Sequence, residues 1–318
     1  MTGIRQNILV SNTARDNYLQ GVVALDQEMS DIRVIDLANF VQANGIDLQF
    51  EGINQAVSTY DLFVFWHMVA TAVSRPPGNA AHGASIFLPW HRMYLIRLEQ
   101  ELQRVLGDAD FAMPYWDWAA DGELDPSEQW RSELWSPAYL GEARGFVQSG
   151  TLAAMQVRLY QIPQTRRVSS AQPRSLWRRA GVIIDDLPNK SGEAGALGEL
   201  DYDMNPWSVN SPMGLRNRLE GFIGGTNMHN RVHVWVNGDM LPMSSPNDPV
   251  FFLNHCNVDR IWETWMIDNG LEYRPGANEG PQGHRINSVM LDLFGGTMTP
   301  QDVLDPSQWY DYDTLLTV

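Results

Sequence analysis

Three of the seven histidines in this chain lie within one stretch, at a spacing typical of a metal site. His229 and His233 are four residues apart, so on a helix both imidazoles leave the same face, one turn apart. His255 follows a loop broken by glycine and proline, in a segment whose apolar residues recur at helical spacing. Two facing helices could therefore place three imidazoles around one metal ion, as helix bundles do in their cores.

The same four-residue spacing also occurs in zinc peptidases, which need a glutamate directly after the first histidine as general base. Position 230 is Asn in this chain, so that chemistry is missing. The pair alone is weak evidence for a metal site, because two histidines at this spacing also occur as ordinary core residues.

A second set of three histidines lies upstream and strengthens the interpretation. His67 lies in an apolar run that predicts a helix, and His91 lies in a second run that we expect Pro89 to open and Gly107 to end. His82 is on the Gly- and Ala-rich connection between these helices. Six of the seven histidines thus form two groups of three, which favours two metal ions. Imidazole suits copper and zinc better than magnesium or calcium, and the pattern alone does not choose between the first two.

Helices must position both sets, so we expect a mainly α protein with a central four-helix bundle and long irregular loops. Asp248 and Pro249 are typical of a helix start and would open the helix that carries His255. Residues 141–215 contain many Gly, Pro, Ser and Asn, which predicts loops bordering the site. The two sets come from different halves of the chain, so we expect one domain over residues 1–318.

Composition excludes several classes of partner. A net charge of -16 argues against nucleic acid and anionic membranes, which both require clustered positive charge. No apolar run approaches the roughly 18–20 residues of a membrane span. The first residues lack the charged-then-apolar pattern of a secretory signal, so we expect a cytoplasmic protein unless a partner carries it out of the cell.

Two further features are expected to be structural. Cys256 is the single cysteine, which excludes an intrachain disulfide, and we expect a buried helix residue and not a metal ligand. The arginines between residues 166 and 179 read as a solvated loop that offsets the acidic surface. A rim that attracts a carboxylate-bearing aromatic substrate is the alternative for this stretch.

Five motifs spread from about residue 60 to the end of the chain identify a family resemblance. They are Phe87-Leu-Pro-Trp-His-Arg92, Pro114-Tyr-Trp-Asp-Trp118, His229-Asn-Arg-Val-His-Val-Trp235, Pro246-Asn-Asp-Pro-Val-Phe-Phe252 and Tyr310-Asp-Tyr312. With them the chain resembles the tyrosinase-like type 3 copper proteins, most closely the short bacterial tyrosinases. The resemblance implies that one copper ion is bound by His67, His82 and His91, and a second by His229, His233 and His255.

The resemblance also implies an activity. A dicopper oxidoreductase of this family uses O₂ as co-substrate to hydroxylate monophenols, or to oxidise o-diphenols to o-quinones. An o-aminophenol oxidase on the same scaffold is the nearest alternative, and a non-catalytic O₂ carrier like the haemocyanins is a remote one. A structural zinc protein would explain neither the paired triplets nor the motifs around them. The substrate is then a small phenol or o-aminophenol, and a copper-delivery or export partner protein is a further possibility.

Three residues receive supporting roles. By resemblance, Glu220 and Asn230 hold a water that takes the phenolic proton. That need is physical, because a phenol with a pKa near 10 is ionised only about one part in a thousand at neutral pH, a deficit of roughly 4 kcal/mol. Asp259 lies one turn after His255, so we expect its carboxylate to orient a ligand histidine.

Two more residues are expected to control substrate access. Met243 lies between the second-set ligands, where its flexible thioether could cover apolar space and move aside. Asn254 replaces the His that usually precedes the last ligand in bacterial tyrosinases, and we expect it to reach the cavity wall. We hypothesise that catechols and o-aminophenols are therefore oxidised well and monophenols hydroxylated slowly.

Overall fold

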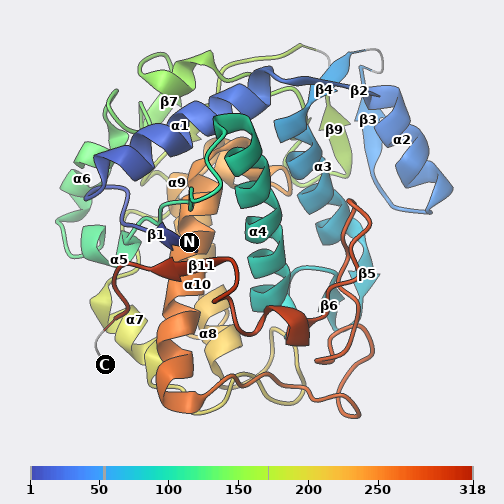
Figure 1. The fold of residues 1–318 in the computed structure, drawn as a ribbon, viewed down its shortest axis with the longest axis vertical. Helices are drawn as coiled ribbons and strands as arrows, with labels where there is room; N and C mark the ends of the chain where they lie inside the picture. The colour runs from blue at the N-terminus through green and yellow to red at the C-terminus, as the bar shows by residue number, and fades with distance from the viewer. Residues whose placement is uncertain (1, 53–54, 171, 317–318) are drawn as a thin grey trace.

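Two long helices, α4 (Phe87–Leu106) and α10 (Val250–Asn269), run side by side through the centre of the molecule (Figure 1). The computed structural model describes residues 2–52, 55–170 and 172–316. Helix α3 (Thr59–Ala72) lies next to α4, and α9 (Met228–Val236) packs on α10. The mainly α fold with a central four-helix bundle is confirmed.

The ends of the bundle helices follow the sequence signals closely. Helix α4 begins at Phe87, two residues before the expected start, so Pro89 lies in the first turn, where its missing N–H has no partner to lose. It ends at Leu106, followed by Gly107 at a φ of 66°, a left-handed conformation that glycine adopts without strain. Helix α10 begins at Val250, whose N–H donates to the Asp248 carboxylate at 3.1 Å.

Shorter elements surround the bundle. The other helices are α1 (Asn12–Gln27), α2 (Val34–Ala43), α5 (Trp118–Asp121), α6 (Pro126–Gln129), α7 (Lys190–Leu197) and α8 (Leu215–Glu220). Single 3₁₀ turns cover Glu133–Trp135, Thr151–Ala154, Gly238–Met240, Ser245–Asn247 and Pro300–Val303. Helix α1 packs across α3 and α4 and covers one face of the bundle. None of the helices in the described residues is both long and apolar enough to span a membrane.

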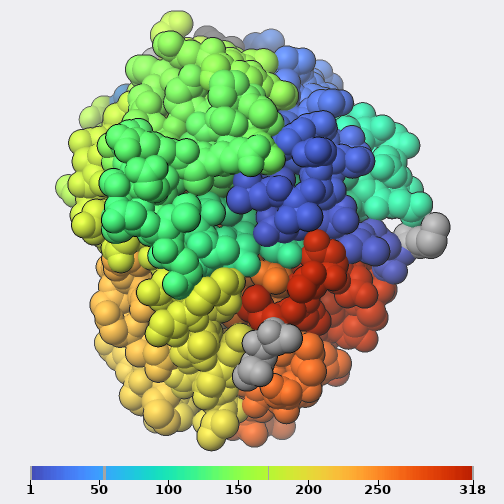
Figure 2. Space-filling view, turned by 90° about the vertical axis from the view of Figure 1, so that its left-hand side faces the viewer, coloured from blue at the N-terminus to red at the C-terminus, as the bar shows by residue number. Residues whose placement is uncertain are grey.

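The strands are short and form small separate sheets. They are β1 (Gly3–Arg5), β2 (Met29–Arg33), β3 (Gln49–Glu51), β4 (Ala56–Ser58), β5 (Ser74–Arg75), β6 (Gly78–Asn79), β7 (Arg144–Phe146), β8 (Tyr160–Gln161), β9 (Arg167–Ser169), β10 (Trp177–Arg179) and β11 (Tyr310–Tyr312). Strands β1 and β11 pair in parallel, so the first and last segments of the chain lie together on one face (Figure 2). Residues 141–215 are largely irregular, as predicted, with a few of these strands and α7 set among loops.

A buried network of ion pairs and hydrogen bonds links α4 to α10. Arg92 on α4 donates from Nε to Asp259 on α10 at 2.6 Å, and Arg5 on β1 donates to the same carboxylate at 3.2 Å. The hydroxyls of Tyr310 and Tyr312 on β11 donate to it at 2.6 and 2.7 Å. Because Arg92 follows His91 directly and Asp259 is one turn after His255, this network sets the spacing of the two helices beside both histidine sets.

Candidate metal centre

The structure brings the six predicted histidines into two groups, and in each group the candidate donor atoms lie within 4.8 Å of one another. The first triad consists of His67 on α3, His82 on the loop after β6, and His91 on α4. Its ring centroids are 5.1 Å apart for His67 and His82, and 4.8 Å apart for His82 and His91.

The second triad is built entirely on helices. His229 and His233 come from α9, His255 comes from α10, and the ring of His229 lies 4.5 and 4.6 Å from the other two. The two triads touch through His91 and His255, whose rings stack at 4.1 Å with an interplanar angle of 8°. This arrangement suits two metal ions that act on one substrate.

Backbone carbonyls fix the tautomers of four of these rings. The Nδ1 contacts are His67 to Met243 O at 2.7 Å, His91 to Phe87 O at 2.8 Å, His229 to Glu220 O at 3.3 Å and His233 to Met240 O at 2.6 Å. A carbonyl can only accept, so each Nδ1 carries the hydrogen and leaves Nε2 with a lone pair. Burial lowers the pKa of His67 to about 3 and that of His233 to about 4, so these rings are neutral at physiological pH.

The free lone pairs require a cation. In the second triad, Nε2 of His229 lies 3.1 Å from Nε2 of His255 and 3.0 Å from Nε2 of His233. The Nε2 lone pairs of His229 and His233 repel at this distance, whereas metal–nitrogen bonds of about 2.0 Å in a tetrahedral site place ligand atoms about 3.3 Å apart. In the first triad, Nε2 of His67 and of His91 are buried without a hydrogen-bond partner among the described residues. The donor chemistry therefore fits copper or zinc.

A cavity of about 380 Å³ opens onto both triads. Four of the histidines line it, namely His67, His82, His229 and His233. The other lining residues are Thr71, Thr226, Asn230, Val234, Leu241, Pro242, Met243 and Ser245, none of which carries a charge. Asn230 and Met243 thus lie where the sequence placed them, at the site. A small, mostly apolar, uncharged aromatic ring suits such a cavity.

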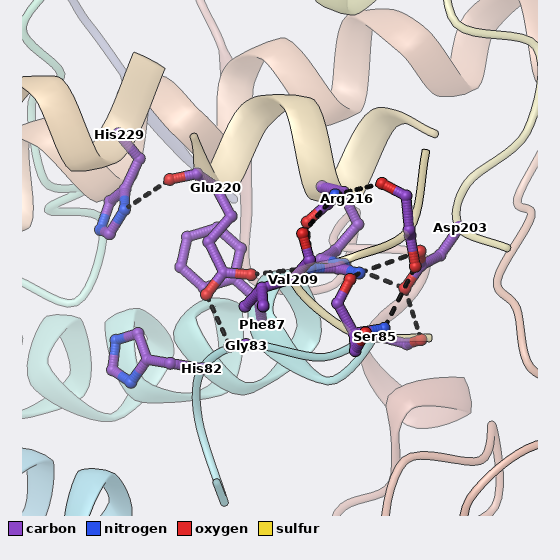
Figure 3. Close-up of polar contacts among 12 residues, drawn as sticks. His82, Gly83, Ser85, Phe87, Asp203, Val209, Arg216, Glu220 and His229 are labelled. Atoms are coloured by element: carbon purple, nitrogen blue, oxygen red, sulfur yellow. Dashed lines mark hydrogen bonds and ion pairs between the residues drawn. The ribbon is translucent and has the colours of Figure 1, made fainter. Parts of the chain in front are cut away.

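Glu220 is close to the site, but its carboxylate does not line the cavity. Its Oε1 accepts a hydrogen bond from the Gly83 N–H at 2.7 Å, and its Oε2 accepts one from Arg216 at 3.1 Å (Figure 3). Desolvation by burial raises the pKa of Glu220 to about 7, although the positive charge of Arg216 acts to lower it. The Glu220 carboxylate is therefore anchored to the backbone after His82 and to Arg216, and its role in holding a water stays a prediction.

Asp259 does not orient a histidine, and that prediction is wrong. Its carboxylate is occupied by the arginines and tyrosines of the network between α4 and α10. The spacing on α10 indicated that Asp259 lies near His255, but not which residues of other segments face its carboxylate. Backbone carbonyls take the expected role for four rings, and Nδ1 of His255 has no partner among the described residues.

Asn254 does not reach the cavity wall. Its side chain is fully buried, it is absent from the cavity lining, and neither amide atom has a hydrogen-bond partner among the described residues. Even His255 lies deeper than the cavity lining. Asn254 directly precedes His255 and is turned from it by about 100° around α10, so its side chain is directed into the interior.

The residues that support the His82 loop were not predicted from the sequence. Arg216 and Asp203 are fully or almost fully buried and form a bidentate ion pair at 2.9 and 3.0 Å. The one available signal was the spacing of Arg216 and Glu220, four residues apart on a helix, which is typical of an ion pair. The long-range contacts to the loop carry no local sequence signature.

Comparisons with known proteins agree with this site. Residues 57–268 match the family profile described as the common central domain of tyrosinase. The tyrosinase of Streptomyces glaucescens is 38% identical over 262 residues, which cover 80% of this chain and 89% of that protein.

Two solved structures have a similar fold. A polyphenol oxidase of Thermothelomyces thermophila superposes with a TM-score of 0.70 at 20% identity, covering 98% of this chain and 89% of that one. A functional unit of octopus haemocyanin gives a TM-score of 0.51 at 19% identity, covering 99% of this chain and 69% of that one. The fold is therefore shared by a polyphenol oxidase and a haemocyanin, whereas the sequence relative described above is a tyrosinase.

Proposed function

Since this chain belongs to the tyrosinase family, we propose that it oxidises o-diphenols much faster than it hydroxylates monophenols. The protein is a tyrosinase-like polyphenol oxidase with a dinuclear copper centre that uses O₂. The matched relatives favour this activity over O₂ carriage and over o-aminophenol oxidation.

The six histidines would hold the two copper ions, one in each triad. When bound, the copper pair supplies electron transfer and the activation of O₂. The protein contributes neutral imidazoles with fixed tautomers, an uncharged cavity for the ring, and helix packing that keeps the triads together. Oxidation of an o-diphenol to the quinone releases two electrons and two protons, which reduce half an O₂ molecule to water.

The position of Glu220 carries the proposed preference. A monophenol must lose a proton with a pKa near 10 before its oxygen can bind as phenolate, and a well-placed general base contributes about 10²- to 10⁴-fold to such a step. No carboxylate lines the cavity in the described part of the chain, and both oxygens of Glu220 are bound elsewhere. Asn230 offers hydrogen bonds to a water but is not a base. We therefore attribute the preference for o-diphenols to the lack of a general base in the cavity, and not to Asn254.

A matched substrate pair tests this proposal. 4-Methylphenol and 4-methylcatechol differ by one hydroxyl, so initial rates of O₂ uptake compare hydroxylation with oxidation in the same cavity. We expect the catechol to react roughly 10²-fold faster at pH 7, the loss that a missing general base causes. The monophenol rate should rise about tenfold per pH unit from pH 6 to 8.5, in step with free phenolate.

Two results would overturn the proposal. Equal rates for the two substrates would show that proton removal is not limiting. A monophenol rate that levels off above pH 7, near the pKa of Glu220, would show that this carboxylate takes the proton after all.

We also propose that copper is supplied by a delivery protein. His91 and His255 lie deeper than the lining of the cavity, so copper has to pass the four outer histidines to reach them. Copper content after expression with and without such a partner, compared with loading by free copper salts, tests the idea. Equal and complete loading by salts alone would exclude a need for the partner.

A further inference from the structure

One of the six histidines differs from the others in how it is held. His82 lies on a loop, whereas the other five are on helices α3, α4, α9 and α10. Its Nδ1 lies 3.5 Å from the Thr71 hydroxyl, a weak contact. On its N-terminal side, the Asn79 side chain accepts from the His82 N–H at 2.7 Å. The position of this ring therefore depends on the backbone of its loop.

The three residues after His82 are each tied to a segment far along the chain. The Gly83 N–H donates to Glu220 at 2.7 Å, and Ala84 forms a β-bridge with Ser208. The Ser85 hydroxyl donates to Asp203 at 2.6 Å, and the Ser85 carbonyl accepts from the Tyr202 hydroxyl at 2.7 Å. All the partners belong to residues 202–220, which we call the 202–220 clamp. Figure 3 shows two of these contacts, from Glu220 to Gly83 and from Asp203 to Ser85.

Arg216 holds the clamp together. Its guanidinium is fully buried between Asp203, at 2.9 and 3.0 Å, and Glu220, at 3.1 Å, and it also donates to the Ser208 carbonyl at 2.9 Å. Arginine stays charged in proteins, and a buried charge needs its partners in place. The ion pairs therefore fix the relative positions of the groups that form hydrogen bonds with Gly83, Ala84 and Ser85.

We propose that the 202–220 clamp positions His82 and thereby sets how tightly the first copper ion is held. Glu220 extends the effect across the site, because its side chain holds Gly83 beside the first triad while its carbonyl faces Nδ1 of His229 in the second, at 3.3 Å. Arg216, Asp203 and Tyr202 are positioning residues that act through the backbone of the loop. The inference rests on the proposed assignment of His82 as a copper ligand.

Two neighbouring tyrosines provide a matched test. Tyr202 and Tyr273 are both buried, their ring centroids are 4.8 Å apart, and each hydroxyl donates to a backbone carbonyl at 2.7 Å. The acceptor of Tyr202 is Ser85 in the His82 loop, whereas the acceptor of Tyr273 is His284, outside both triads. Tyr202→Phe and Tyr273→Phe therefore remove the same bond with similar effects on stability.

The readout is release of copper from the loaded protein into an excess of chelator, followed with time. Loss of groups that support metal ligands typically costs 10- to 100-fold in metal affinity. We expect Tyr202→Phe to speed release of one of the two copper ions about 10-fold, with the other unchanged, and Ser85→Ala to act in the same direction. Tyr273→Phe should release both ions at the wild-type rate, although its unfolding midpoint falls by a similar amount.

The outcomes separate this inference from the proposed function. If the wild type holds two copper ions and oxidises a catechol, but Tyr202→Phe and Tyr273→Phe release copper alike, the clamp does not position His82. If the wild type does not bind two copper ions, the proposed function fails and the inference fails with it.

Discussion

The two histidine triads reach similar geometry by different means. The second triad takes every member from a helix, and its Nε2 atoms converge at 3.0 and 3.1 Å. The first takes two members from helices and His82 from a loop, which buried polar contacts from residues 202–220 hold in place. Two packed helices are enough to build the second ligand set, whereas the loop ligand of the first is supported by distant segments.

The triads also share supports. The chain between α9 and α10 orients one ring in each, because the Met240 carbonyl faces His233 and the Met243 carbonyl faces His67. Arg92 and Asp259 hold the helices that carry His91 and His255. Loss of a shared support should therefore affect both triads, whereas loss of the bonds that Tyr202 and Ser85 make in the clamp should affect only the first.

The largest effect is expected when copper-free protein is acidified. The unfolded chain takes up a proton at each histidine below a pKa of about 6.5, while the buried rings stay neutral, so the unfolded state binds more protons. As the pH is lowered below about 6.5, the free energy of unfolding should decrease by about 1.4 kcal/mol per pH unit for each buried histidine. With several such rings, this loss is enough to unfold a typical domain.

Denaturant unfolding of the copper-free protein between pH 7 and 4 measures this loss. In the folded state His67 and His233 should stay mostly neutral until the pH approaches 4, because burial lowers their pKa values to about 3 and about 4. Stability that does not change between pH 7 and 5 would contradict neutral, buried triads.

Asp259→Asn should have the next largest effect. The substitution leaves Arg5 and Arg92 buried without their shared carboxylate, which typically costs about 3–5 kcal/mol. Both copper ions should be held less tightly, because α4 and α10 lose their common tie. The control is Glu101→Gln, which removes an exposed pair with Arg104 on α4 and should cost less than about 1 kcal/mol. Similar unfolding free energies for the two variants would exclude the network as the tie.

The two methionines of the shared connection should separate substrate fit from stability. Met243 lines the cavity, whereas the Met240 side chain is fully buried, and both supply a carbonyl to a histidine. Met243→Ala should raise kcat/KM for a bulky phenol relative to a small one by about 10-fold, the usual effect of a small change in pocket size. Met240→Ala should cost about 2–5 kcal/mol and leave substrate preference unchanged. The reverse pattern would place Met240 at the substrate.

The smallest effect concerns charge at the cavity rim beside the first triad. Arg166 donates to the Met243 sulfur at 3.5 Å, its side chain is 48% exposed, and its nearest acidic group is Asp47 at 4.0 Å. Arg166→Gln should lower kcat/KM for a catechol that bears a carboxylate by about twofold to fivefold. It should not lower kcat/KM for a catechol that bears an amine. Arg167→Gln removes the same charge from the neighbouring pair with Glu51 and should have no such selectivity. Equal effects of the two variants would indicate overall charge only.

Sequence spacing was sufficient for the bundle and for five of the six ligand histidines, because helix periodicity is local and these five lie on helices, whereas His82 was grouped with them by its place between His67 and His91. It was not sufficient for Asp259 and Asn254, or for the partners that hold the carboxylate of Glu220. Spacing on a helix gives the face that a side chain occupies, but not which distant segment lies opposite. The partners of Asp259 come from β1, α4 and β11, and those of Glu220 come from the His82 loop and its own helix.

The assignment of one copper ion to each triad is tested by the copper content per chain of the reconstituted wild type, His82→Ala and His233→Ala. We expect two copper ions in the wild type and one in each variant, together with loss of catechol-dependent O₂ uptake in both variants. One copper ion in the wild type, or two in either variant, would contradict the assignment of one ion to each triad.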